Sequence, residues 1–357
     1  MTLDISTTIG NIKLYSPFLN ASGCWCYSYK ELEDMRHCQS GAYVSKTITM
    51  LPRDGNPEPR LFYDVNLSVN SMGLPNMGYA AYTHYSLTTK ERQKPFFLSI
   101  STMDLKDTHQ MMNMIAMTHL DTNVKGVEFN VSCPNIIGKG QMGYDIEQLK
   151  NFLDLLSESK LSEISRNDIA IGLKMSPYFD KYQFQTVADI IKDYPRLDFL
   201  TCINGIGNGL VIDNVKEESV IAPNNGRGGL GGSIVKPTGL ANVKTFKRLL
   251  GDKVDIIGCG GVSDGMDAFE YFLAGASAVS VGTQLLRETP LAFGRLNQEL
   301  ITIMEDKKYA SIVEFSNKLN IDEDIKIETQ KRKEAEQNKE LEQIKKRNAY
   351  DLSYAMC

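Results

Sequence analysis

Histidine is scarce in this sequence, with four residues among 357. His37, His84, His109 and His119 lie in helix-like or loop segments, outside the polar clusters considered below. A nucleophilic cysteine is normally activated by a histidine beside it. The scarcity therefore argues against a hydrolase that works through a Cys–His pair.

Long apolar runs are missing too. No stretch approaches the roughly 18 apolar residues that a membrane helix needs, and residues 1–20 lack the basic start and apolar core of a signal peptide. The seven cysteines are odd in number and scattered, and the Cys24–Cys26 pair has no second pair of zinc ligands. We expect a reduced, cytoplasmic protein with no membrane contact and no metal site.

Neither sign of charge dominates. The formal net charge is −5 and the pI is about 5.6. This balance argues against nucleic acid or an anionic membrane as the main partner. It does not argue against a small anionic substrate, because one local site can be basic in an acidic protein.

Short apolar runs alternate with helical patterns along the first 300 residues. Continuous apolar runs of this length are typical of strands covered on both faces. Eight of them with helices between predict a (β/α)₈ barrel, with a doubly wound sheet as the alternative. The expected strands are 18–23, 42–47, 96–101, 126–132, 170–176, 198–204, 254–261 and 278–284. The clearest helical patterns cover 145–159, 180–194 and 265–276.

Two stretches do not fit the alternation. Residues 48–95 are too long for a simple connection and are rich in Pro, Gly and Asn, so we expect an excursion over the barrel mouth. Residues 318–357 contain nine acidic and nine basic residues and few apolar ones. We interpret them as a charged, helical extension, following a catalytic domain over residues 1–317.

Polar and glycine-rich clusters end the predicted strands, where both architectures bind their ligands. Glycines at 228–232, 258–261 and 282 free backbone N–H groups that suit a phosphate, although glycines can also merely turn the chain. Lys46 and Lys174 end strands and suit a negative charge in a dry site. Four asparagines suit a ligand edged with amides, although asparagine is also common in turns: Asn70, Asn130, Asn135 and Asn204.

Cys133 lies in the stretch "EFNVSCPN", between a strand end and Pro134. A free cysteine is most often a small buried hydrophobe. A thiolate in a polar loop is nevertheless a competent base when its surroundings lower its pKa. Because no histidine is near, a cysteine that removes a proton beside a hydride acceptor fits the pattern better than a nucleophilic cysteine.

Taken together, these stretches resemble the dihydroorotate dehydrogenase family, and most closely its soluble class 1A. The similarity spans about residues 3–317 in order, and the combination is specific although each piece alone is not. The motifs are NSMGLPN (70–76), NVSCPN (130–135), GLKMSPYFD (172–180), CINGIGNGL (202–210), GGLGG (228–232), KPTGLANV (236–243) and CGGV (259–262). Class 2 enzymes have serine at the base position and an N-terminal membrane extension, and class 1B enzymes pair with an iron–sulfur subunit.

The resemblance implies an FMN-dependent homodimer that oxidises (S)-dihydroorotate to orotate in pyrimidine biosynthesis. Cys133 would remove the C5 proton while the C6 hydride passes to flavin N5, and fumarate would reoxidise the flavin. Lys46 and Lys174 join Cys133 as the implied catalytic residues. The implied substrate residues are Lys46, Asn70, Met72, Gly73, Leu74, Asn130, Asn135, Asn204 and Gly205. The implied cofactor residues are Ala21, Ser22, Lys46, Thr47, Ser101, Asn130, Lys174, Gly232, Cys259, Gly260, Gly261, Gly282 and Thr283.

Two features depart from the family pattern. Gly205 stands where the family usually has a serine expected to bond the substrate, and the charged tail is foreign to the pattern. Three alternatives stay open: an FMN barrel acting on another dihydropyrimidine, a flavin-binding scaffold without dihydroorotate activity, and a flavin-dependent hydroxyacid oxidase. The last fits least, since such enzymes need a histidine base.

Overall fold

The computed structural model describes residues 3–89, 94–132 and 140–319, together with Lys333 and Gln337. The chain divides into two units, Met1–Lys318 and Leu319–Cys357. Most of the predicted charged extension lies outside the described residues, although Lys333 and Gln337 are helical and exposed. The domain boundary at residue 317 and the helical nature of the extension therefore stay predictions.

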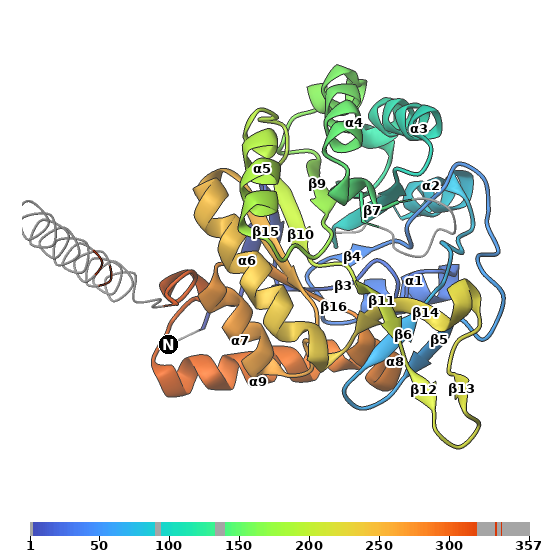
Figure 1. The fold of residues 1–357 in the computed structure, drawn as a ribbon. Helices are drawn as coiled ribbons and strands as arrows, with labels where there is room; N and C mark the ends of the chain where they lie inside the picture. The colour runs from blue at the N-terminus through green and yellow to red at the C-terminus, as the bar shows by residue number, and fades with distance from the viewer. Residues whose placement is uncertain (1–2, 90–93, 133–139, 320–332, 334–336, 338–357) are drawn as a thin grey trace, which may run out of the picture. The chain divides into compact units, whose positions relative to one another are not determined.

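Within the described residues, a sheet of eight parallel strands forms the centre of the first unit (Figure 1). Its order is β3-β16-β15-β10-β9-β8-β7-β4, so each strand lies beside its neighbour along the chain. The strands are β3 (Phe18–Asn20), β4 (Tyr43–Val44), β7 (Phe96–Ser101), β8 (Val124–Asn130), β9 (Ala170–Lys174), β10 (Phe199–Cys202), β15 (Asp255–Cys259) and β16 (Ala278–Val281). This is the strand order of a barrel. In a doubly wound sheet, the chain instead adds strands first on one side of the first strand and then on the other. The predicted barrel is confirmed.

A side chain closes the sheet between its first and last strands. The Asn20 Nδ2 of β3 donates to the Val44 carbonyl of β4 at 2.9 Å, and the Val44 N–H donates to Asn20 Oδ1 at 2.8 Å. The amide thus reproduces the pair of hydrogen bonds that a neighbouring strand would supply. Together with the hydrogen bond from the Gly41 N–H to the Phe18 carbonyl at 2.8 Å, this side chain closes the barrel.

Helices cover the outside of the barrel (Figure 1). They are α1 (Tyr29–His37), α2 (Tyr79–Thr88), α3 (Leu105–Thr118), α4 (Ile146–Glu158), α5 (Lys181–Lys192), α6 (Lys236–Leu250), α7 (Gly265–Ala274), α8 (Thr283–Glu288) and α9 (Ala292–Lys307). Asp145, Asp180 and Asp264 cap α4, α5 and α7 by accepting hydrogen bonds from N–H groups of the first turn. The helical patterns predicted at these three places are confirmed.

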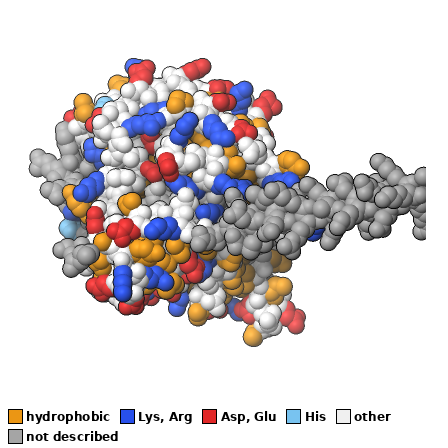
Figure 2. Space-filling model, turned by 90° about the vertical axis from the view of Figure 1, so that its left-hand side faces the viewer, with side chains coloured by type: hydrophobic (Ala, Val, Ile, Leu, Met, Phe, Trp, Pro, Cys, Tyr) orange, Lys and Arg blue, Asp and Glu red, His pale blue; other side chains and the backbone are white. Residues whose placement is uncertain are grey.

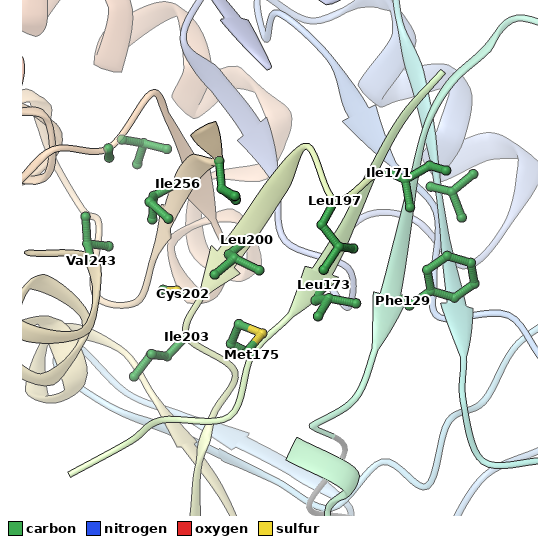
Figure 3. Packing of buried hydrophobic residues seen from close by; sticks show 14 of the residues in the cluster. Phe129, Ile171, Leu173, Met175, Leu197, Leu200, Cys202, Ile203, Val243 and Ile256 are labelled. Carbon is green, nitrogen blue, oxygen red and sulfur yellow. The ribbon is translucent and has the colours of Figure 1, made fainter. Parts of the chain in front are cut away.

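The outward face of the sheet packs against these helices. Figure 3 shows Leu173 of β9, Leu200 of β10 and Ile256 of β15 in the same apolar layer as Val243 of α6. Both faces of each strand are therefore buried, which explains why the sequence shows continuous apolar runs and not an alternating pattern.

Two phenylalanine rings fill the lower interior of the barrel. The Phe97 and Phe199 centroids lie 5.8 Å apart. A β-carbon at Gly126 would come within 2.4 Å of the Phe97 ring, and one at Gly172 within 2.4 Å of the Phe199 ring. The two glycines thus provide the room for the rings. Below them, the hairpin of β1 (Thr7–Ile9) and β2 (Ile12–Leu14) joins the same buried cluster.

A second, antiparallel sheet lies at the carboxyl ends of the barrel strands, with the order β11-β14-β6-β5. Its strands β5 (Leu61–Tyr63) and β6 (Ser68–Asn70) come from the predicted excursion. The other two, β11 (Ile206–Leu210) and β14 (Arg227–Gly231), follow barrel strand β10 and were not predicted. A short hairpin, β12 (Ile212–Asp213) and β13 (Glu218–Ser219), connects these two strands.

The excursion is also shorter than predicted, because residues 48–95 include helix α2. Its buried side chains include Tyr79, Tyr82 and Tyr85, spaced three residues apart along one face. This helix was not predicted, because the many Pro, Gly and Asn residues before it are typical of loops and turns.

Candidate active site

A cavity lies between the carboxyl ends of the barrel strands and the second sheet. It measures about 1170 Å³, counting its opening to solvent. Eighteen of the predicted site residues line it, although they come from segments spread over more than 260 positions. They are Ala21, Ser22, Lys46, Thr47, Asn70, Met72, Gly73, Leu74, Asn130, Lys174, Asn204, Gly205, Gly232, Cys259, Gly260, Gly261, Gly282 and Thr283.

Three predicted residues are not part of this lining. Ser101 is buried at the end of β7, opposite Asn130, and its Oγ accepts a hydrogen bond from the Met103 N–H at 3.2 Å. Cys133 and Asn135 lie outside the described residues. The assigned roles of all these residues stay predictions.

Two buried lysines bring positive charge to the cavity wall. The Lys46 and Lys174 residues are each 6% exposed, and the Lys46 Nζ donates to the Gly23 carbonyl at 3.1 Å. The Lys174 Nζ donates to the Cys259 Sγ at 3.1 Å. By contrast, acidic and basic side chains are interspersed over the face of the molecule shown in Figure 2. The cavity is thus a basic site in an acidic protein, as the sequence allowed.

Hydrogen bonds link the asparagine amides across the barrel mouth. The Asn130 Nδ2 donates to Thr47 Oγ1 at 3.2 Å, and the Asn204 Nδ2 donates to Asn130 Oδ1 at 3.3 Å and to the Ser132 carbonyl at 3.1 Å. The Ser132 N–H donates back to Asn130 Oδ1 at 3.1 Å. Both asparagines therefore hold Ser132, the residue directly before Cys133.

Burial keeps other cysteines near the cavity as thiols. It raises the pKa of Cys24, which lines the cavity, to about 11. Burial also raises the pKa of Cys202, at the end of β10, above its ordinary value. Neither group is a thiolate at neutral pH, so neither is a candidate base.

Glycines and hydroxyl groups form one end of the cavity. Gly232 and Gly261 have φ angles of +85° and +71°, which favour glycine. A β-carbon at Gly231 would come within 2.7 Å of the Ser68 Oγ, which itself lies 2.8 Å from the Thr283 Oγ1. Exposed backbone and hydroxyl donors of this kind suit a phosphate group.

The GGLGG motif is built differently from the expected phosphate loop. Its first four residues belong to strand β14, where Gly229 pairs with Asn70 and Gly231 with Ser68. A β-carbon at Gly228 would lie 2.4 Å from the Asn70 carbonyl oxygen. The motif thus lets two strands approach closely, and only its last three residues, Leu230, Gly231 and Gly232, line the cavity.

Sequence reasoning missed the apolar part of the lining. Besides Gly231, which belongs to the predicted glycine cluster, the lining includes residues that were not predicted: Gly23, Cys24, Leu61, Ser68, Ile203, Leu230, Val235 and Leu286. Several belong to the second sheet, whose glycine-rich strands carry no apolar periodicity. The apolar run Leu61–Tyr63 was the one available signal, and three residues are too few to predict a strand.

The chemistry of the lining suits an organic ring system with an anionic end. Apolar side chains offer flat contact surfaces, amides and lysines offer a polar edge, and the glycine end offers backbone donors. Across the described part of the chain, no three His, Cys, Asp or Glu side chains gather closely enough to bind a metal ion. The helices of that part are also too short or too polar to cross a membrane.

Comparison with known proteins gives a consistent result. Residues 4–304 match the family described as "Dihydroorotate dehydrogenase". The chain is 44% identical to "Dihydroorotate dehydrogenase (fumarate)" of Trypanosoma brucei brucei over 307 residues, which covers 85% of this chain and 95% of that protein. It is 41% identical to the protein of the same name from Lachancea kluyveri over 324 residues, covering 90% and 99%.

Solved structures share the fold. A crystal structure of DHODH from Eimeria tenella in complex with ferulenol has a TM-score of 0.71 and 19% identity, covering 88% of both chains. The ligand-free form from the same organism has a TM-score of 0.72 and 20% identity, covering 88% of this chain and 91% of that one.

Proposed function

The chain belongs to the dihydroorotate dehydrogenase family, and on that premise we propose that it oxidises (S)-dihydroorotate to orotate with fumarate as the final acceptor. The enzyme class predicted from the sequence, an oxidoreductase of this family, is confirmed by the match. One observation carries the specific proposal. Two buried lysines and three asparagines line a single cavity, and one of these asparagines, Asn204, binds Ser132, the residue directly before Cys133.

The proposed cofactor is FMN, and the residues present fit it. The glycine end with Ser68 and Thr283 would hold the phosphate, while Lys46, Lys174, Thr47 and Asn130 would face the polar edge of the ring system. When bound, FMN supplies the acceptor for the hydride from C6 of the substrate, and the electrons then pass to fumarate.

In this proposal Cys133 removes the proton from C5 of dihydroorotate. Asn204 and Asn130 act on it indirectly, because they bind both the N–H and the carbonyl of Ser132 and so fix where the Cys133 loop begins. The Asn70 side chain, with Met72, Gly73 and Leu74, would complete the substrate side. The Lys46 ammonium would bind the substrate carboxylate, which stays anionic at neutral pH.

The first experiment follows the flavin absorbance of FMN-loaded protein under anaerobic conditions. Dihydroorotate should bleach the flavin band, and fumarate added afterwards should restore it. Bleaching without recovery would contradict fumarate as the acceptor while keeping the dehydrogenase. An unbleached band would contradict the substrate, and dihydrouracil would then test another dihydropyrimidine, which the missing hydroxyl at Gly205 favours.

The substitution Cys133→Ala tests the base. The rate of flavin reduction should fall by roughly 10²–10⁴, because that is what a positioned base contributes, while FMN stays bound. Cys38→Ala is the matched control, since Cys38 lies next to α1 and outside the cavity lining. A near-normal rate in the Cys133 variant would remove Cys133 from the mechanism.

We also propose, from the family resemblance, a cytoplasmic homodimer. Sedimentation equilibrium of the purified protein should give twice the mass of the 39.9 kDa chain. A single 39.9 kDa species at micromolar concentration would contradict the dimer.

A further inference from the structure

Glu128 is a buried acid inside the barrel that the proposed mechanism does not use. It lies on β8, two residues before Asn130, and is 4% exposed. Its register partner on β9 is Gly172, which has no side chain. The Glu128 Oε2 therefore reaches across β9 and accepts a hydrogen bond from the Thr201 Oγ1 of β10 at 2.6 Å.

The other oxygen of this carboxylate lacks a hydrogen-bond donor. The Glu128 Oε1 is buried, and no group in the described part of the protein donates to it. A buried carboxylate without donors or a counter-charge is strongly destabilising. A cation near this carboxylate would compensate its charge.

Lys174 supplies such a charge through space, while its Nζ donates to the Cys259 Sγ and makes no direct ion pair with Glu128. On β9, Lys174 is the register partner of Thr201 on one side and of Asn130 on the other. It therefore lies two residues beyond Gly172, the position at which the Glu128 side chain crosses β9. The titratable groups around Lys174 are Glu128, Cys202 and Cys259, with Cys24 and Lys46 on the opposite wall of the cavity. Burial alone lowers the pKa of Lys174, but Cys259 and Glu128 outweigh burial and hold the pKa above its ordinary value.

We propose that Glu128 is a positioning residue whose buried charge keeps Lys174 a cation at the floor of the cavity. Glu128 itself does not line the cavity, so it acts on any ligand only through Lys174. Its value to catalysis rests on the proposed function, in which Lys174 faces the polar edge of FMN. Its effect on Lys174 does not, because that effect belongs to the folded protein alone.

The test is Glu128→Gln in the apoprotein, followed by urea unfolding between pH 8 and 10. Glutamine keeps the shape and can still accept from Thr201, but it removes the charge. We expect burial then to outweigh Cys259, the remaining partner, and to lower the pKa of Lys174, so that the folded state releases a proton that the unfolded state keeps. The variant should be less stable than wild type at pH 8, and its unfolding constant should approach that of wild type by up to tenfold per pH unit as the pH rises.

The outcome that overturns the proposal is a loss of stability that does not change with pH. Asp255→Asn is the matched control, because Asp255 is a half-buried acid at the opposite end of the barrel. Its loss of stability should not shrink over this pH range. If Glu128→Gln fails to fold, Thr201→Val removes the hydrogen bond that holds the carboxylate and should show the same trend at a smaller size.

A second readout uses the flavin but not the substrate. The midpoint potential of FMN in Glu128→Gln should become more negative, since a neutral Lys174 stabilises reduced flavin less. A tenfold loss of preference for reduced flavin corresponds to about 30 mV for two electrons. An unchanged or more positive potential would contradict the proposal. A wild-type protein that binds FMN but is not reduced by dihydroorotate would instead contradict the proposed function alone.

Discussion

The two ends of the barrel are built from the same strands but use their buried groups differently. At the amino end, Asp198 accepts from the Ile171 N–H at 2.8 Å and pairs with Arg166 and Arg196. At the carboxyl end, the ammonium groups of Lys46 and Lys174 face a cavity. The amino end pairs its charges within the protein, whereas the carboxyl end also places two ammonium groups where a ligand can reach them. The difference separates stability from function along one barrel axis.

The largest effect should come from the amino end, where Phe199→Ala would empty the barrel centre. Truncation of a buried phenylalanine costs about 3–5 kcal/mol of unfolding free energy. We expect such a loss in urea unfolding, with FMN affinity nearly unchanged. Phe179→Ala is the matched control, since Phe179 is 66% exposed and should change stability little. A large loss of FMN affinity with little loss of stability would contradict the assignment of stability to the amino end and of ligand binding to the carboxyl end.

The carboxyl end should respond in the opposite way. Asn204→Ala removes the hydrogen bond that the Asn204 Oδ1 accepts from the Gly205 N–H and the two that its Nδ2 donates to Asn130 and Ser132, each worth about 0.5–1.5 kcal/mol. Flavin reduction should slow by about 10- to 100-fold if that energy orients the reacting groups, measured by stopped-flow absorbance. Stability in urea should fall by less than in the Phe199 variant. An unchanged rate would remove Asn204 from the site.

One acid at the carboxyl end, Asp267, contributes to stability. The separation of stability from function between the two ends is therefore not complete. Asp267 accepts from Lys236 and Ser263 beside α7. Burial raises the pKa of Asp267, but these partners outweigh burial and hold the pKa below its ordinary value. Its stabilisation is therefore full above the unfolded pKa of about 3.9 and is lost as pH falls below it. Asp267→Asn should cost about 1 kcal/mol at pH 6, because it weakens the hydrogen bonds that the carboxylate accepts, and less as pH falls below 4. Urea unfolding at both pH values checks this, and an equal cost at both would contradict it.

The smallest effect should come from Gly205→Ser, which restores the residue usual in the family. The added β-carbon would lie 3.1 Å from the Leu230 carbonyl oxygen, so strand β14 must yield slightly. The new hydroxyl adds at most about 1 kcal/mol of substrate binding, and crowding offsets part of it. The dissociation constant for dihydroorotate should change less than about fivefold by flavin titration. A change beyond about tenfold would mean that this position decides substrate choice.

The barrel and the lysines, asparagines and glycines at its mouth were predictable because each signal is local, whereas the other predicted lining residues came from the family resemblance. A continuous apolar run such as 96–101 predicts a buried strand, and a polar residue at its end predicts the mouth. The second sheet was not predictable, since strands such as Arg227–Gly231 owe their position to close packing against β6 and not to their own apolar pattern. Glu128 was visible in its motif, but its role depends on a missing side chain at Gly172, on another strand.

The amino-terminal hairpin has a consequence for how the protein is made. The Thr7 Oγ1 donates to the Ser277 carbonyl, 270 residues later, and the Gly10 N–H donates to Asp255, 245 residues later. At a synthesis rate of about 5–20 residues per second, the hairpin waits roughly 15–50 s for these partners to leave the ribosome. Throughout that time, the complete barrel interior against which Ile9, Ile12 and Leu14 pack has not yet formed. The hairpin residues are therefore among the last to be buried although they are synthesised long before their partners, and nascent chains should need protection at this hairpin.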